Sequence, residues 1–154
     1  MATPFSLDAV ALLERVGVDA IKIASGDLTW DGLIARAAMS RVPLVISTGM
    51  ANMTEIGEAV EAARGAGDGG IILLHCVSGY PTPAADSNLK RLVTLADRFG
   101  VLVGLSDHTM GATTAVAATA PYFDTMSFAP DITAAAVVAP GLIDVTSPPY
   151  GIIA

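Results

Sequence analysis

The stretch Ala20-Ile21-Lys22-Ile23-Ala24-Ser25-Gly26-Asp27 decides how the rest of the chain is interpreted. A short apolar run that ends in turn residues is typical of a buried strand. A lysine inside such a run is costly to bury unless an anionic group meets it. Two explanations of Lys22 are therefore open: it pairs with a carboxylate on a neighbouring strand, or it holds an anion at the C-terminal end of its own strand.

The composition limits the class of protein. The chain has 154 residues, of which 53% are apolar and 15% are charged, and this balance suits one folded domain with a large core. The formal net charge of −7 argues against nucleic acid or an anionic membrane as the main partner. The single cysteine, Cys76, excludes an internal disulfide and fits a reducing compartment.

Two further patterns bear on location. The start of the chain shows no basic segment followed by an apolar one, so no signal peptide is expected. No apolar run reaches the roughly 18 residues of a membrane span. We therefore expect a cytoplasmic protein with no membrane partner.

A pattern of helix, turn, apolar strand and polar strand end recurs four times along the chain. Besides the strand around Lys22, strands are expected at Pro43–Gly49, Ile71–Cys76 and Val101–Thr109. Successive strands start roughly 25 to 30 residues apart, which is the size of one βα unit. Helices are expected between and after the strands, at Leu7–Val16, from Asp31 to about Ser40, from Asn52 to about Gly65, at Asp86–Phe99 and from Gly111 to about Ala120.

Continuous apolar strands that alternate with helices imply a parallel sheet covered by helices. We predict an α/β fold: a partial (β/α)₈ TIM barrel of about four βα units over residues 1–120, then a divergent segment over residues 121–154. Chemistry in such a barrel sits where the strands end. A doubly wound sheet also binds ligands there, but no G-x-G-x-x-G or Walker loop follows any expected strand.

Six motifs carry a family resemblance that spans about residue 2 to residue 118. They are Thr3-Pro4-Phe5, Lys22-Ile23-Ala24-Ser25-Gly26, Ser47-Thr48-Gly49-Met50, His75-Cys76, Tyr80-Pro81-Thr82-Pro83 and Gly104-Leu105-Ser106-Asp107-His108-Thr109. In this order and spacing, the motifs resemble the sialic acid synthase family, which includes N-acetylneuraminate synthase and its legionaminate and pseudaminate relatives. The resemblance implies a TIM-barrel transferase that condenses phosphoenolpyruvate with an N-acetylated sugar aldehyde of the N-acetylmannosamine type. The products are a nonulosonic acid and phosphate, the cofactor is Mn²⁺ or Mg²⁺, and a homodimer is one expectation.

Phosphoenolpyruvate carries a carboxylate and a phosphate, so its site needs cations and hydrogen-bond donors. Lysine supplies a point charge with three donors, and serine hydroxyls near helix N-termini can hold oxyanions. The resemblance implies that five residues line this pocket: Thr3, Lys22, Ser25, Ser47 and Ser106. On the residues alone, ordinary turn chemistry explains each serine equally well.

The resemblance also implies a metal ion, which polarises the aldehyde carbonyl. His108 is the candidate ligand, with Asp107 beside it as a supporting group, although a lone histidine at a strand end is more often structural. His75 also matches a family strand, and a hydrogen-bonded core histidine explains it at least as well.

Three residues match the sugar pocket of the family. Asp27 stands where relatives carry an acidic residue that contacts the sugar, Tyr80 matches a motif tyrosine, and Ser78 stands where some relatives have asparagine. The candidate catalytic residues are therefore Lys22, Asp27 and Tyr80, and the sugar contacts are Asp27, Ser78 and Tyr80.

The chain also departs from the family pattern. Relatives carry earlier barrel strands with another lysine and an acidic group, a later Glu-x-His element with the second metal histidine, and an antifreeze-like domain. Here no histidine follows His108 and no glutamate follows Glu61. A metal held by one histidine would be weakly bound. The resemblance therefore predicts an incomplete form of the synthase, and an inactive form is one expectation.

Two other hypotheses remain open. The first is a Schiff-base aldolase in which Lys22 is the nucleophile, which requires a dry pocket around the amine. The second is a non-catalytic barrel fragment that associates with another chain, because a partial barrel exposes sheet edges and apolar helix faces.

Overall fold

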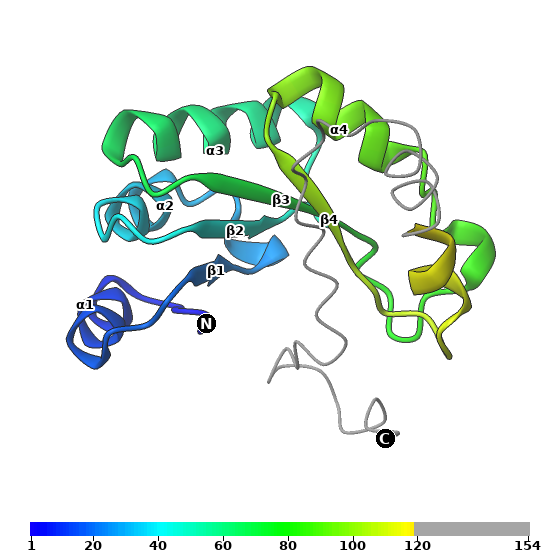
Figure 1. The fold of residues 1–154 in the computed structure, drawn as a ribbon, viewed down its shortest axis with the longest axis horizontal. Coiled ribbons are helices and arrows are strands. Elements are labelled where there is room, and N and C mark those ends of the chain that lie inside the picture. Colours follow the sequence, from blue (N-terminus) through cyan, green and yellow to red (C-terminus); the bar gives the residue numbers. More distant parts are fainter. Residues whose placement is uncertain (119–154) are drawn as a thin grey trace, which may run out of the picture.

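The computed structural model describes residues 1–118, and the predicted divergent segment 121–154 lies outside the described residues. The centre of the fold is a parallel sheet in the order β1-β2-β3-β4 (Figure 1). Its strands are β1 (Ile21–Ile23), β2 (Leu44–Ser47), β3 (Ile71–Cys76) and β4 (Leu102–Ser106). Each strand pairs with the next one along the chain. The predicted α/β fold with parallel strands is confirmed.

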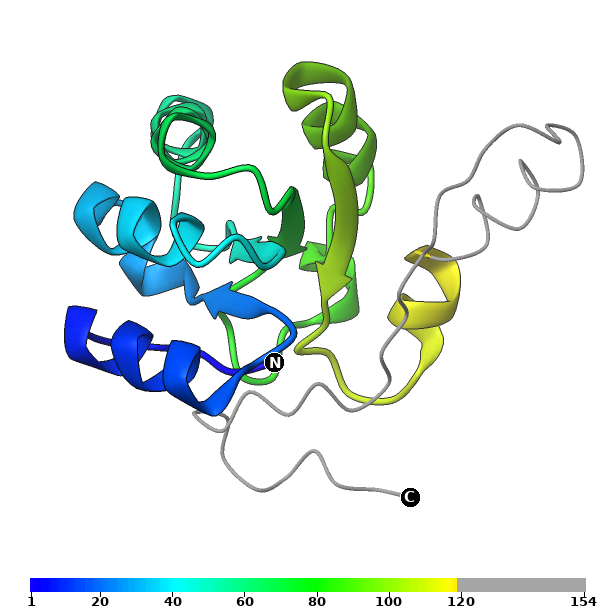
Figure 2. The same ribbon diagram turned by 60° about the vertical axis from the view of Figure 1, so that its left-hand side comes forward.

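Helices fill the connections between the strands and lie on one side of the sheet (Figure 2). The α-helices are α1 (Leu7–Val16), α2 (Asp31–Ala38), α3 (Met53–Ala66) and α4 (Arg91–Phe99), and residues 113–118 are also helical. Two short 3₁₀ helices, η1 (Ser25–Asp27) and η2 (Ala84–Asp86), follow the ends of β1 and β3. The helices on one side and the free strand ends at one edge reproduce the arrangement of a barrel segment.

The helix ends follow from local capping chemistry. The Ser6 hydroxyl accepts a hydrogen bond from the backbone N–H of Ala9, and Gly17 takes the left-handed conformation that ends α1. At α3, the Asn52 side chain accepts from the N–H of Glu55, and the Glu55 carboxylate accepts from the N–H of Asn52. This reciprocal capping box fixes where α3 begins, with Asn52 five residues after the end of β2, and so sets the path of the loop between the strand and the helix.

The fourth predicted helix, Asp86–Phe99, is partly wrong. The chain forms η2 first and begins α4 only at Arg91. Asn88 adopts a positive φ of 42°, which a continuous right-handed helix does not allow. The carbonyl oxygen of Ser87 also lies 2.7 Å from His75 Nε2, so its partner is a side chain and not a backbone N–H of a helix. Within α4, Val93 lies on the outer side and is 62% exposed.

The core lies between the sheet and the helices. Along β1 and β2 the fully buried side chains occur at every second residue, as expected for one face of a pleated sheet. The core side chains of the strands are Ile21, Ile23, Leu44, Ile46 and Leu73, and those of the helices include Val10, Leu33, Ile34, Ile56, Val60 and Leu95. The other face of the sheet is therefore free to carry polar groups.

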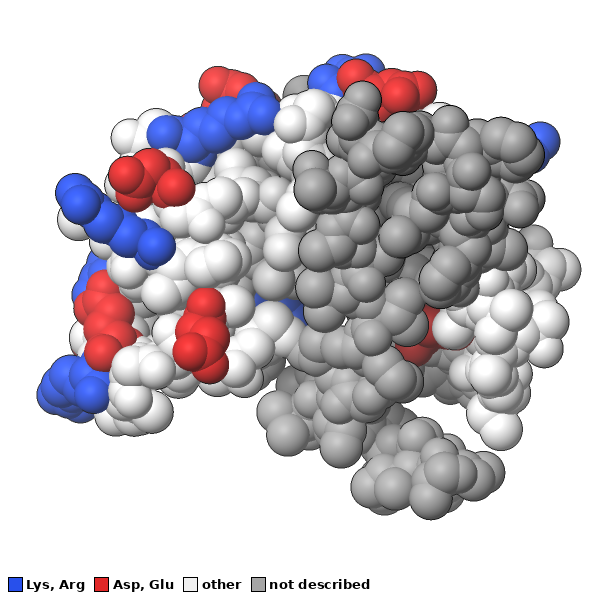
Figure 3. All heavy atoms as spheres, viewed as in Figure 1, with Lys and Arg blue, Asp and Glu red and all other residues white. Residues whose placement is uncertain are grey.

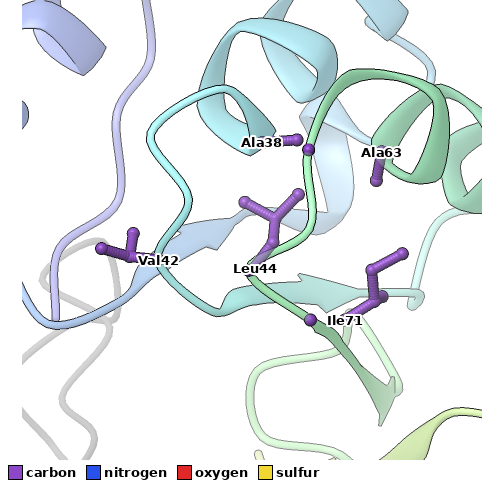
Figure 4. Close-up of a pocket in the computed structure, with 8 residues that line it drawn as sticks. Ala38, Val42, Leu44, Ala63 and Ile71 are labelled. Atoms are coloured by element: carbon purple, nitrogen blue, oxygen red, sulfur yellow. The ribbon is translucent and has the colours of Figure 1, made fainter.

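A small apolar pocket lies where β2 and β3 begin, at the opposite end from their polar exits. Ala38, Leu44, Ala63 and Ile71 line it (Figure 4), together with Val42 and three glycines. A side chain at Gly67 would meet the carbonyl of Ala38. The pocket lining contains no polar side chain, so it marks close packing of α2 and α3 over the sheet and is not a candidate site.

The charged surface agrees with the composition. Acidic and basic side chains lie interspersed along the left and upper margins of the visible face (Figure 3). Over residues 1–118, no helix has both the length and the apolar character needed to cross a lipid bilayer.

Candidate active site

Four chemically important side chains leave the same face of the sheet. The strand register aligns Lys22 with Val45 and Ile72, and aligns Cys76 with Ser106. Because side chains two residues apart share a face, Lys22, Ser47, Cys76 and Ser106 all project away from the helices. In a barrel this face is the interior.

The part of this face that β1 and β2 form is buried. Lys22 is 7% exposed and Ser47 is 2% exposed. The Ser47 hydroxyl has no hydrogen-bond partner within residues 1–118, and such a group costs about 1–3 kcal/mol when it stays unpaired. Neither β1 nor its neighbour β2 carries a carboxylate, so the neighbouring-strand carboxylate suggested for Lys22 does not come from β2. A buried lysine and an unpaired buried hydroxyl on one face of the sheet form an arrangement that favours an anionic ligand.

At the exits of β1, β2 and β3, three groups form a connected cluster. The backbone N–H of Gly49 donates to the Ser25 hydroxyl at 3.1 Å, and that hydroxyl lies 3.7 Å from the sulfur of Cys76. Ser25 is the first residue of η1, so it leaves the strand just where the chain turns. The cluster therefore brings the candidate oxyanion donor Ser25 to the level of Cys76.

His108 joins this cluster from the exit of β4. Its Nδ1 lies 2.9 Å from the carbonyl oxygen of Val77 and 3.8 Å from the Cys76 sulfur. A carbonyl can only accept, so the hydrogen of the imidazole sits on Nδ1 and the lone pair of the neutral ring sits on Nε2. Nε2 lies 3.5 Å from the Ser106 hydroxyl. The backbone thus fixes the tautomer of His108 and presents Nε2 as an acceptor or a ligand.

The pKa values of Cys76 and His108 are coupled by their contact. Burial raises the pKa of the Cys76 thiol, but hydrogen bonds from His108, Ser25 and Ser78 outweigh it and bring the pKa below its ordinary value. The same contact with Cys76 raises the pKa of His108 despite its burial, and the charge of Lys22 acts in the opposite direction.

Tyr80 and Ser78 come from the loop after β3. The Tyr80 ring lies over His108 with a centroid distance of 4.3 Å and a tilt of 33°. The Tyr80–Pro81 peptide bond is cis. Both Tyr80 and Ser78 are exposed, and Ser78 contributes a hydrogen bond that lowers the pKa of Cys76. The loop therefore places both side chains at the mouth of the cluster.

The remaining predicted residues lie near this edge with fewer contacts. Asp27 ends η1 and is partly buried, and burial raises the pKa of its carboxyl. Thr3 follows Ala2, whose carbonyl accepts from the N–H of Lys22, so Thr3 runs beside β1 at the open edge of the sheet. The Asp107 carboxylate accepts from the N–H of Thr109 at 2.9 Å, which shapes the exit of β4, and among the described residues it makes no hydrogen bond to His108.

His75 faces the other way. It is one residue from Cys76 on β3, so its ring points to the helices, where Nε2 lies 2.7 Å from the carbonyl of Ser87. The side chain is 2% exposed, and burial lowers the pKa of the imidazole. The structure therefore agrees with the interpretation of His75 as a hydrogen-bonded core histidine.

A metal ion was expected from the family resemblance. His108 offers one suitably oriented nitrogen, but within residues 1–118 no group of three or more His, Cys, Asp or Glu side chains could hold a metal ion. Metal sites in proteins draw on several ligands and on groups that orient them. The described residues fit one ligand of such a site and do not form the site by themselves.

Sequence reasoning missed two members of the cluster. Cys76 was used only as evidence on disulfides and as part of a motif, yet it contacts both Ser25 and His108. Gly49 enters only as the end of an expected strand and as part of a motif, yet its N–H donates to the Ser25 hydroxyl. The alternation of β3 could have revealed Cys76, because it places His75 and Cys76 on opposite faces of a buried strand.

Comparison with known proteins agrees with this geometry. The sequence model of the NeuB family matches residues 1–121. The chain is 41% identical over 118 residues to the pseudaminic acid synthase of Helicobacter pylori, covering 77% of this chain and 35% of that protein. It is also 41% identical over 122 residues to the N,N'-diacetyllegionaminic acid synthase of Campylobacter jejuni, covering 78% and 36%.

Solved structures give the same result. The N-acetylneuraminic acid (sialic acid) synthetase of Leptospira borgpetersenii, crystallised with citrate, superposes with a TM-score of 0.73 at 36% identity. The match covers 76% of this chain and 41% of that one. The chain spans about a third of the length of the curated relatives that it matches. The fold, the six motifs and these matches together show that the chain belongs to the NeuB family.

Proposed function

We propose that the polar face of the sheet binds phosphoenolpyruvate and serves its condensation with an N-acetylated sugar aldehyde. One observation carries this proposal: Lys22 and the unpaired hydroxyl of Ser47 are buried on the same face, below the exits that hold Ser106 and His108. A buried cation and a free hydroxyl donor suit a phosphate or carboxylate group. The names of the relatives, pseudaminic and legionaminic acid synthases, support a sugar acid as the product.

The reaction has a simple balance. A bond forms between C3 of phosphoenolpyruvate and the aldehyde carbon of the sugar, water adds at C2, and phosphate leaves. In this proposal the charge of Lys22 neutralises the phosphate, and the hydroxyls of Ser25 and Ser47 donate hydrogen bonds to it. The hydroxyls of Ser106 and Thr3 donate hydrogen bonds to the carboxylate of phosphoenolpyruvate. Fixed donors that already surround the developing charge lower the barrier because they need no rearrangement during the reaction.

The sugar side of the site follows from the residues at its mouth, of which Tyr80 and Ser78 are exposed and Asp27 is half-buried. Tyr80 and Ser78 lie on the loop after β3, and Asp27 lies at the exit of β1. We propose that they contact the sugar, with Asp27 and Tyr80 beside the reacting carbonyl. The raised pKa of Asp27 makes its carboxyl a better proton acceptor than an ordinary aspartate.

We also propose that His108 Nε2 is one ligand of a Mn²⁺ or Mg²⁺ ion whose other ligands come from outside residues 1–118. Such an ion, when bound, polarises the aldehyde carbonyl. The hydrogen bond from Nδ1 to Val77 orients the ring and leaves the lone pair on Nε2, which now lies 3.5 Å from the Ser106 hydroxyl, for this role.

The direct test is a coupled phosphate-release assay with phosphoenolpyruvate, N-acetylmannosamine and Mn²⁺. The proposal expects release that depends on the sugar and that disappears in the Lys22→Ala variant. The matched control is Lys90→Ala, which removes the other lysine of the chain from an exposed position. Equal sugar-dependent release from the Lys22→Ala variant would contradict the site assignment.

Three expectations stay predictions. They are a cytoplasmic location, a homodimer, and the alternative of a non-catalytic fragment that associates with another chain. Light scattering measures the last two, since both require a mass above that of the monomer. Phosphoenolpyruvate binding without any phosphate release would favour the fragment hypothesis over the enzyme.

A further inference from the structure

Gly49 lies between two parts of the proposed phosphoenolpyruvate site. It follows β2, two residues after Ser47, and its N–H donates to the Ser25 hydroxyl at 3.1 Å. A side chain at this position would have no room. A Cβ built on Gly49 would lie 2.6 Å from the Ser78 hydroxyl oxygen, 2.8 Å from the Cys76 sulfur and 3.0 Å from the Cys76 carbonyl oxygen. These separations are shorter than ordinary carbon contacts.

The hydrogen bond to Ser25 has a consequence for ligand binding. A serine hydroxyl has one hydrogen to donate and lone pairs that accept. The N–H of Gly49 occupies one lone pair of the Ser25 oxygen, and the hydroxyl hydrogen stays available for donation to another group. In the described structure the hydroxyl faces the Cys76 sulfur at 3.7 Å, which is a weak acceptor. A phosphate oxygen is a far stronger acceptor and would take this hydrogen from the sulfur.

We propose that Gly49 is the positioning residue of the anion site. Its N–H holds the Ser25 oxygen while the hydroxyl hydrogen stays available for donation, and its missing side chain lets Cys76 and Ser78 close against the exit of β2. This inference rests on the proposed function, because it assigns Ser25 to an anion of the phosphoenolpyruvate type. Gly49 acts through Ser25, Cys76 and Ser78 and does not itself need to touch the ligand.

The test is the Gly49→Ala substitution in the full chain, with phosphoenolpyruvate binding followed by calorimetry. Because the new methyl group displaces Ser78 and Cys76 and disturbs Ser25, affinity should fall by about ten-fold or more, as for the loss of one charge-assisted hydrogen bond. Gly65→Ala is the matched control. A Cβ at Gly65 meets nothing within 4 Å, and the residue lies in α3 away from the cluster. Its affinity should equal that of the unmodified chain.

A rescue experiment separates positioning from a general loss of structure. In a Cys76→Ala, Ser78→Ala background, two of the three crowding atoms are gone. There the added Gly49→Ala change should cost less than about three-fold in affinity, so the effects are not additive. A loss of equal size in both backgrounds would overturn the inference.

The only cysteine of the chain gives a second readout that needs no ligand. Cys76 is 6% exposed, so its thiol should react slowly with an aromatic disulfide reagent. Displacement by the Gly49→Ala methyl group should raise this rate severalfold, while Gly65→Ala leaves it unchanged. Unchanged thiol reactivity in Gly49→Ala would overturn the inference whatever the binding result. Raised reactivity in a chain that does not bind phosphoenolpyruvate would uphold the packing role of Gly49 and reject the proposed function.

Discussion

The Tyr80 ring and the His108 imidazole lie 4.3 Å apart between centroids, tilted by 33°. The two side chains come from the exits of β3 and β4, so this contact ties the loop after β3 to the strand beside it. A second link between the same exits is the hydrogen bond from Nδ1 of His108 to Val77. Together they fix the plane of the imidazole, and Nε2 lies 3.5 Å from the Ser106 hydroxyl on the site side.

The ring contact leads to a prediction for Tyr80. In Tyr80→Phe the ring remains, so the nuclear magnetic resonance signal of the His108 ring should keep its ring-current shift. In Tyr80→Ala that shift should vanish, and KM for the sugar should rise by about ten-fold, as expected for loss of an aromatic contact and a hydroxyl. The contact would have no role in sugar binding if Tyr80→Ala left KM unchanged.

The two histidines should respond differently to removal. His75→Ala deletes a buried ring and its bond to Ser87, so the free energy of unfolding should fall by about 2–4 kcal/mol. His108→Ala should lower activity strongly and stability much less, because its ring lines the site. Urea unfolding followed by circular dichroism measures the first effect, and phosphate release measures the second.

The reverse pattern would exchange the roles given to the two residues. It would make His108 the structural histidine and His75 the functional one. That outcome would contradict the structure, in which His75 and Cys76 lie on opposite faces of β3 and only the Cys76 face belongs to the site.

Much of the fold could be predicted because its signals are local. Apolar runs predicted the four strands, and the helix expected at Leu7–Val16 and the helix start expected at Asn52 agree with the structure. The start of α4 could not be predicted, because it depends on a long-range partner. His75, twelve residues earlier, lies against the Ser87 carbonyl, and Asn88 turns into the left-handed region.

The candidate site shows the same division. Strand ends pointed to Lys22, Ser47 and Ser106, because a parallel sheet collects its exits at one edge. The central position of Cys76 needed the register between β3 and β4, and the role of the Val77 carbonyl needed backbone geometry. Backbone donors and acceptors have no residue type, so a sequence cannot point to them.

Acid should weaken the contact between α1 and α2. Two hydrogen bonds from Arg36 and one from Ser40 lower the pKa of Glu14 from 4.5 to about 2. A carboxyl whose pKa is lower in the folded chain stabilises the fold above its unfolded pKa and loses this contribution as pH falls from about 4.5 toward 2. Urea unfolding should therefore show a smaller difference between about pH 6 and about pH 3 in Glu14→Gln than in the unmodified chain.

Glu58→Gln is the control for that experiment, because Glu58 is an exposed glutamate on α3. It should keep the full pH dependence of the unmodified chain. An unchanged pH dependence in Glu14→Gln would show that the ion pair with Arg36 does not act in solution.

The aldolase hypothesis makes an opposite prediction about Lys22. A Schiff-base enzyme forms an imine between a lysine amine and a carbonyl substrate, and borohydride reduces the imine to a stable adduct. Our proposal gives Lys22 a binding role, so we expect no adduct after treatment with pyruvate or the sugar aldehyde and borohydride. Mass spectrometry of the peptide that contains Lys22 decides the matter, and an adduct on that lysine would favour the aldolase.

The central claim is that the buried amine of Lys22 binds the anionic groups of phosphoenolpyruvate through charge-assisted hydrogen bonds. Isothermal titration calorimetry of the unmodified chain, Lys22→Ala and Lys90→Ala with phosphoenolpyruvate tests it most directly. We predict equal binding by the unmodified chain and Lys90→Ala, and a loss of at least about ten-fold in Lys22→Ala, since a charged hydrogen bond contributes 1.5–3 kcal/mol. Unchanged affinity in Lys22→Ala would contradict the account.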